Sequence, residues 1–168
     1  MNALERRIHL SLVFLIFLPL IAALFIPLLF KKLGRIHTGW FVLIVPVVLF
    51  IYYLTLLPTT LEGGTLVSEL SWIPSIDLAI VAYIDGLSLL FSLLISGIGA
   101  LVVLYSIFYL DKKREQLHNF YVYLLMFMTA MLGVVQSDHM ISLYLFWELT
   151  SISSFLLIGY WYTRDRSR

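Results

Sequence analysis

Residues 86–110 read GLSLLFSLLISGIGALVVLYSIFYL, a run of 25 residues without a charged side chain. A bilayer core about 30 Å thick is crossed by roughly 20 apolar residues in an α-helix, because each residue advances the helix by about 1.5 Å. Backbone N–H and C=O groups find no water inside lipid, so a helix that satisfies them internally is the stable form of such a run. The stretch therefore predicts a transmembrane helix.

Four further runs have the same character. The chain is 61% apolar and 12% charged, whereas soluble domains are roughly 45–50% apolar and about 25% charged. The predicted fold class is an all-α integral membrane protein with five transmembrane helices, arranged as a single membrane domain over residues 1–168. The predicted helices are residues 8–30, 39–57, 86–110, 119–135 and 140–162.

The composition also excludes several classes of function. A net charge of +1 offers no basic surface for a phosphate backbone, so nucleic acid is not an expected partner. The chain has no cysteine, which excludes disulfide frameworks, iron–sulfur ligation and cysteine zinc sites. The four histidines lie at the ends of the apolar runs without a metal-ligand spacing such as H-E-x-x-H. We expect no metal, no cofactor and no catalytic motif of a soluble enzyme.

Residues 58–85 differ from the runs on either side, because they carry four acidic side chains and neither Lys nor Arg. Residues 66–72 and 78–84 show the period-two alternation that is typical of strands, and Trp72-Ile73-Pro74-Ser75 between them contains turn formers. This stretch predicts a short external β-hairpin between the second and third helices.

The distribution of basic residues predicts the orientation. Nine Lys and Arg residues fall in 31–38, 111–118 and the C-terminal tail, which five spans place on one side of the membrane. Only Arg6 and Arg7 fall on the other side. Because cytoplasmic loops are enriched in Lys and Arg, we expect a multi-pass protein of the bacterial cell membrane with its N-terminus outside and its C-terminus cytoplasmic.

Glu148 is the one charged side chain inside a predicted span. It lies near the middle of 140–162, where an acid costs about 2.5–3.5 kcal/mol on insertion scales. Such a residue either keeps its proton or faces a polar cavity and a cation. Tyr144, Thr150, Ser151 and Ser154 place hydroxyls close to it in sequence. We interpret Glu148 as a proton-translocating group with these hydroxyls as a supporting polar face; the alternative is a neutral hydrogen bond between helices.

Two titratable residues, Asp138 and His139, stand together in the short external turn before this last helix. They are candidates for an external proton entrance, and a solvated turn is the alternative. Asp85 opens the third helix, where an acid near the N-terminus suits the helix dipole. We expect a structural role for Asp85.

Several segments resemble a known family. Residues 83–91 (YIDGLSLLF), 120–128 (FYVYLLMFM) and 146–151 (FWELTS) resemble the third, fourth and fifth helices of the antiporter-like subunits of respiratory complex I. Residues 37–44 (HTGWFVLI) and 154–161 (SFLLIGYW) extend the likeness to the A subunit of the Mrp-type multisubunit Na⁺/H⁺ antiporters. The chain resembles the N-terminal part of that longer protein.

The resemblance implies that Glu148 is an essential buried carboxylate, which pairs with a lysine on a later helix and gates proton movement. It implies a transporter component rather than an enzyme, one part of a multisubunit Na⁺/H⁺ antiporter that exchanges monovalent cations (Na⁺) for protons. The implied partners are the other subunits, H⁺ and Na⁺ as transported ions, and the lipid bilayer. Two alternatives stay open: a proton-pumping membrane-arm subunit of NADH–quinone oxidoreductase, and a helical scaffold or assembly protein.

Overall fold

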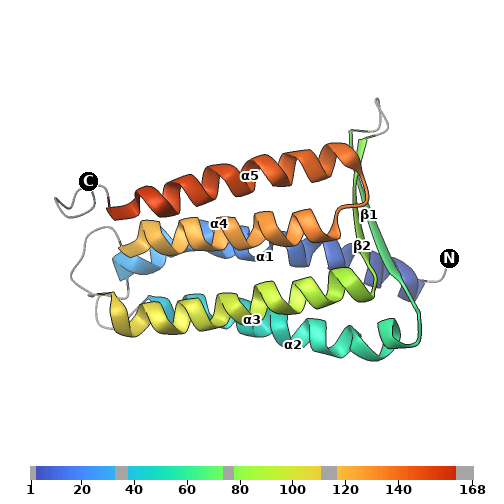
Figure 1. Cartoon of the computed structure of the whole chain (residues 1–168), viewed down its shortest axis with the longest axis horizontal. Helices are drawn as coiled ribbons and strands as arrows, with labels where there is room; N and C mark the ends of the chain where they lie inside the picture. The colour runs from blue at the N-terminus through green and yellow to red at the C-terminus, as the bar shows by residue number, and fades with distance from the viewer. Residues whose placement is uncertain (1–2, 33–37, 74–77, 111–116, 162–168) are drawn as a thin grey trace.

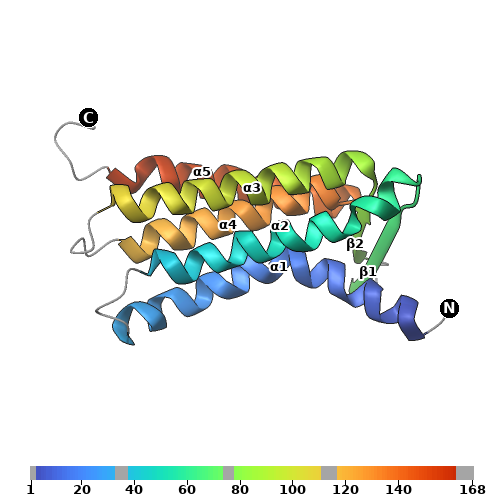
Figure 2. The same cartoon turned by 90° about the horizontal axis from the view of Figure 1, so that it is seen from below.

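The computed structural model describes residues 3–32, 38–73, 78–110 and 117–161. Figures 1 and 2 show long helices running side by side, with a β-hairpin across one end. Within the described ranges the elements are α1 (Ala3–Lys32), α2 (Gly39–Leu61), β1 (Leu66–Ile73), β2 (Leu78–Ile84), α3 (Gly86–Tyr109), α4 (Leu117–Gln136), α5 (Met140–Ile158) and the 3₁₀-helix η2 (Gly159–Trp161). The most extensive helix contacts join α2 to α3, and α4 to both α5 and α1.

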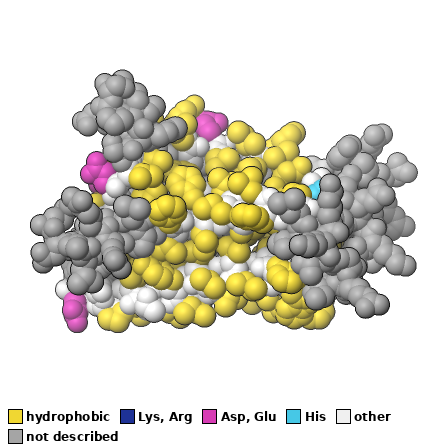
Figure 3. All heavy atoms as spheres, turned by 180° about the vertical axis from the view of Figure 1, so that it is seen from behind, with side chains coloured by type: hydrophobic (Ala, Val, Ile, Leu, Met, Phe, Trp, Pro, Cys, Tyr) yellow, Lys and Arg dark blue, Asp and Glu magenta, His cyan; other side chains and the backbone are white. Residues whose placement is uncertain are grey.

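The helices α2, α3, α4 and α5 are each long and apolar enough to cross a membrane, with mean hydropathy between 1.5 and 2.5. In α1 the side chains are described only for residues 12–27, and Leu12–Pro27 is a shorter apolar helix. Figure 3 shows hydrophobic side chains spread along the flank of the bundle. A multi-pass membrane protein, the predicted class, is therefore confirmed.

The helix ends differ from the predicted bounds by a few residues. Hydropathy marks only the apolar part of a helix, and α4 extends beyond 119–135 at both ends. The helix α2 was expected to end before Pro58, but it continues through that proline to Leu61. At the other end of the bundle α5 stops at Ile158, because the cap at Gly159 tightens the chain into η2, and Tyr162 lies outside the described residues.

The strands β1 and β2 pair antiparallel, which confirms the predicted hairpin. The register sets Leu66 opposite Ile84 and Ser68 opposite Ala82. The bundle-facing side of the hairpin joins a core that α1, α2, α3, α4 and α5 also form. The turn was predicted at Trp72-Ile73-Pro74-Ser75, but β1 continues through Ile73, and Pro74 and Ser75 lie outside the described residues.

Asp85 and Ser88 close the start of α3 with two reciprocal hydrogen bonds. The Ser88 N–H donates to Asp85 Oδ1 at 2.8 Å, and the Asp85 N–H donates to Ser88 Oγ at 2.8 Å. This pair forms a capping box, which satisfies backbone donors that the first turn of a helix leaves free. The bonds from Ser88 hold the pKa of Asp85 below its ordinary value of 3.8, because N–H donors favour the charged carboxylate. The expected structural role of Asp85 is confirmed.

The lowered pKa of Asp85 predicts a pH dependence of this helix start. The contribution of the cap to stability is fully present above pH 3.8 and is lost as the pH falls through the lowered folded value. We expect the Ser88 backbone amide signal in NMR spectra to titrate with a midpoint below 3.8. Asp85→Asn keeps an acceptor at the cap but cannot ionise, so its Ser88 signal should stay constant over that range. A wild-type midpoint at or above 3.8 would contradict the assignment.

Candidate functional site: the carboxylate of α5

The helix α5 begins at the turn that follows α4. His139 caps it, because its Nδ1 accepts a hydrogen bond from the Ile141 N–H at 3.3 Å. Glu148 is the ninth of the 19 residues of α5, roughly 12 Å along the axis from Met140. The carboxylate therefore belongs to the middle of the helix and not to either end.

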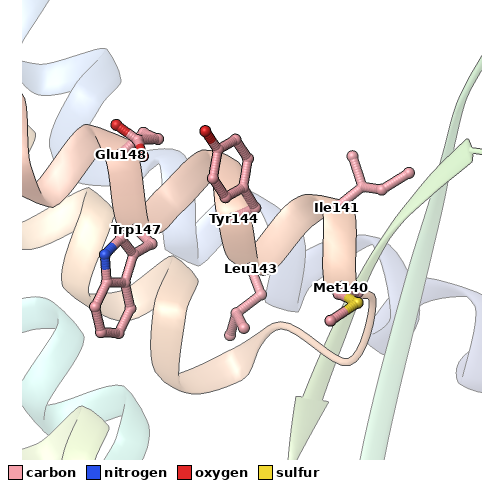
Figure 4. A pocket seen from close by; sticks show the side chains of 6 residues that line it. All are labelled: Met140, Ile141, Leu143, Tyr144, Trp147 and Glu148. Carbon is pink, nitrogen blue, oxygen red and sulfur yellow. The ribbon is translucent and has the colours of Figure 1, made fainter.

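The two sides of α5 have different surroundings. Ser142, Phe146 and Ser153 are buried in the bundle, and the Phe146 ring lies 5.8 Å from the ring of Phe17 on α1. Glu148 is exposed, as is Tyr144 at 61%. Figure 4 shows the Glu148 carboxylate and the Tyr144 hydroxyl pointing to the same side of α5. The acid therefore faces out of the described bundle.

An open groove of about 500 Å³ runs along this exposed side of α5. Its lining is apolar apart from the Glu148 carboxylate and the few polar atoms of its aromatic side chains. No other described residue hydrogen-bonds or ion-pairs with that carboxylate. The residues that line the groove are Met140, Ile141, Leu143, Tyr144, Trp147 and Glu148. The arrangement offers one group, halfway along a membrane-crossing helix, that can bind and release a proton.

The predicted polar face is only partly assembled. Tyr144 and Ser151 are exposed at i−4 and i+3 from Glu148, so they share its side of the helix. Thr150 and Ser154 are half-buried at i+2 and i+6, and these spacings turn them away from Glu148. The Thr150 hydroxyl donates to the Trp147 carbonyl at 2.6 Å, so its proton is already used within α5.

The predicted entrance residues lie at the hairpin end of α5. The Asp138 N–H donates to the Val81 carbonyl at 3.1 Å, which ties this turn to β2, and the Asp138 side chain is exposed. The half-buried His139 ring serves as the helix cap. Between this turn and Glu148 the exposed side of α5 carries the apolar Ile141. In the described residues no polar chain joins Asp138 or His139 to Glu148, and no group of His, Asp and Glu could hold a metal.

A second polar cluster was not predicted from the sequence. The Gln136 side-chain amide at the end of α4 donates to the Tyr53 hydroxyl of α2 at 2.8 Å and to Ser92 Oγ of α3 at 2.9 Å. All three side chains are at most 1% exposed. The available signal was a glutamine that directly follows an apolar run, together with serines at every fourth position from Ser88 to Ser96.

Two family models match the chain. Residues 71–121 match the N-terminus of NADH-ubiquinone oxidoreductase (complex I) chain 5. Residues 137–168 match the transmembrane model of NADH:quinone oxidoreductase and Mrp antiporters. The second match contains Glu148 and every other residue of the candidate site described above.

Curated relatives and solved structures agree with these models. The chain is 60% identical over 149 residues to the A subunit of the Na⁺/H⁺ antiporter of Alkalihalophilus pseudofirmus, covering 89% of this chain and 18% of that protein. It is 63% identical over 152 residues to the corresponding A1 subunit of Staphylococcus aureus, covering 90% and 19% respectively. The Mrp complex from Dietzia sp. DQ12-45-1b superposes with a TM-score of 0.76 at 28% identity, over 88% of this chain and 16% of that one.

The likeness in fold extends to the membrane-bound sulfane sulfur reductase, an archaeal respiratory membrane complex. Its TM-score is 0.74 at 23% identity, over 94% of this chain and 31% of that one. The chain is similar, in both of these family matches, to the antiporter-like membrane subunits that complex I and the Mrp antiporters share. Within that group it is related to the A subunit of Na⁺/H⁺ antiporters, so the predicted resemblance is confirmed. It spans less than one fifth of the length of the A subunits it matches.

Proposed function

We propose that the chain is part of a multisubunit Na⁺/H⁺ antiporter, in which Glu148 binds and releases the transported proton. The observation that carries the proposal is the position of this acid, at the middle of α5 and on the side that the described residues leave open. Glu148 lies within residues 137–168, the segment that matches the transmembrane model of NADH:quinone oxidoreductase and Mrp antiporters. Neither the complex I alternative nor the scaffold alternative gains support from a specific feature of the described residues.

An acid at this position needs more protein around it. Inserting an acidic side chain that faces lipid costs about 2.5–3.5 kcal/mol of free energy on insertion scales. Acidic residues within membrane helices therefore face the interior of a helix bundle or a hydrated cavity. The related A subunits are more than five times the length that the chain covers. We infer that, in a complete A subunit, helices that follow α5 in the sequence fill the groove beside Glu148. These helices would bring a cationic partner to the carboxylate.

The proposed coupling is electrostatic. When a cation approaches Glu148, it favours the charged carboxylate and so the release of the bound proton; when the cation leaves, proton uptake is favoured. Tyr144 and Ser151 share this side of α5 and can hold water beside the acid. The movement of the cation and the movement of the proton are thereby linked through one titratable group, the Glu148 carboxylate.

The proposed orientation places the hairpin outside the cell. The described residues at that end of the bundle carry acidic side chains such as Glu62 and Glu69. Of the eleven Lys and Arg residues of the chain, only Arg6 and Arg7 fall on this side of the five proposed spans. The helices α1 and α3 end, and α2 and α4 begin, at the opposite end of the bundle (Figure 1). The basic segments 31–38 and 111–118 join these helices in sequence, which suits the cytoplasmic side. With α1 counted as a fifth span, the N-terminus is outside and the C-terminus cytoplasmic. Lipid and the other antiporter subunits are then the surroundings of the chain.

A hydrophobic carbodiimide tests the proposal, because it reaches carboxylic acids from within the bilayer. In membranes that contain the complete complex we expect the reagent to modify Glu148 and to stop Na⁺-driven proton flux in step with that modification. Full modification of Glu148 with unchanged flux would refute the proposed role.

A further inference from the structure

The hairpin end of the bundle contains a group of buried polar atoms apart from the α5 groove. Gln136 there links α4 to Tyr53 of α2 and to Ser92 of α3. Both of these hydrogen bonds are donated by the same atom of the Gln136 amide, the nitrogen Nε2. The other atom, Oε1, is buried and has no hydrogen-bond partner. Exchanging the two atoms of the amide group would only leave the nitrogen without one.

Two hydroxyls at the same end of the bundle also lack a hydrogen-bond partner. Ser68 Oγ of β1 and Ser137 Oγ, in the residue after α4, are buried and without a hydrogen-bond partner. Ser68 is completely buried. Buried polar atoms in native proteins are nearly always hydrogen-bonded, either to protein or to an ordered water. Three unpartnered atoms at one junction therefore point to a ligand that both donates and accepts.

The strand register brings Ser68 and Ser137 onto one line. Ser68 pairs with Ala82, and Ala82 forms an isolated bridge with Ser137. Directly paired residues in antiparallel strands point to the same face of a sheet. That face is the one that packs on the helices, because Ala82 belongs to the core. With strands roughly 4.8 Å apart, Ser68 and Ser137 flank the small Ala82 side chain at a spacing that bridging waters can span.

We propose that this junction is a water-binding site, in which ordered water joins Gln136 Oε1 and the hydroxyls of Ser137 and Ser68. Through the Gln136 amide, the water connects the hairpin to α2, α3 and α4. On α4 the buried apolar Leu132 and Met128 follow this junction toward the membrane centre. The junction is a local hydration site and not a continuation of the path to Glu148.

The direct test is a high-resolution electron cryo-microscopy map of the protein in its complete complex. We expect ordered density within hydrogen-bond distance of the free end of the Gln136 amide, and its loss in Gln136→Met. A map that shows ordered water elsewhere at comparable depth, but none at this junction, would overturn the proposal.

Thermal unfolding is a second test, because Ser68→Ala should shift the unfolding midpoint in opposite directions with and without the bound water. If water holds the Ser68 hydroxyl, Ser68→Ala loses that bridge and lowers the unfolding midpoint by about 2–4 °C. If the hydroxyl has no partner, the same change relieves a buried polar atom and leaves the midpoint equal or higher. Thr129→Val is the matched control, because Thr129 Oγ1 is also buried without a partner but lies two turns deeper on α4. A midpoint that rises in both variants would contradict the proposal.

Discussion

Replacing Glu148 by glutamine is expected to reduce Na⁺-dependent proton flux through the complete antiporter complex by about 100-fold, the scale of losing a positioned proton-transfer group. Glutamine keeps the shape and the hydrogen-bonding capacity of the side chain, but it cannot bind and release a proton. The measurement is proton uptake into proteoliposomes on addition of Na⁺, with the amount of assembled complex determined in the same preparation.

The controls separate transport from assembly. Glu148→Asp retains the titratable group on a shorter side chain and should keep part of the flux. Glu62→Gln removes an exposed acid at the end of α2 and should leave the flux unchanged. If Glu148→Gln transports normally in a correctly assembled complex, Glu148 has no role in proton movement. If it fails to assemble, the scaffold alternative gains.

Enlarging Gly133 is expected to destabilise the packing of α4 against α5. A side chain at this position of α4 would overlap the Phe146 ring of α5. The two helices can pack closely only while residue 133 has no Cβ. We expect Gly133→Leu to destabilise the fold by about 1–3 kcal/mol, as over-packing of a tight contact does. Thermal unfolding of the protein in lipid nanodiscs measures the change.

A double substitution tests whether the Phe146 ring is the cause. Phe146→Ala removes the ring, so the cost of Gly133→Leu should be much smaller in that background than in the wild type. Gly159→Ala is the matched control, because a Cβ there meets no atom within 4 Å. Equal losses from Gly133→Leu in both backgrounds would show that α4 and α5 do not meet at this contact.

Most of the fold could be predicted because lipid leaves the backbone few choices. Long uncharged runs must be helical, and the alternation in 66–72 and 78–84 identified the hairpin before its register was known. The helix ends were less predictable. Pro58 normally marks a boundary, yet α2 continues through it to Leu61, where the Thr60 hydroxyl bonds the Leu57 carbonyl at 3.1 Å.

The candidate site could be predicted only in part. Glu148 was evident as the single charge within a span, and its spacing to Tyr144 and Ser151 follows from the helix period. The side of α5 on which it lies could not be derived, because apolar residues surround this helix on every side and no stripe marks the packed face. The Gln136 cluster was missed because its partners come from α2 and α3, 83 and 44 residues away in sequence.

The most direct measurement of the central claim is the water accessibility of position 148 in the complete complex. The chain has no cysteine, so Glu148→Cys introduces its single thiol, and Glu62→Cys provides an exposed reference. If Glu148 lies inside the membrane and is enclosed by protein, a bulky water-soluble maleimide should label position 62 readily and leave position 148 unlabelled from both sides. Labelling of position 148 as fast as position 62 would place the acid at a wet surface and contradict its role in ion translocation.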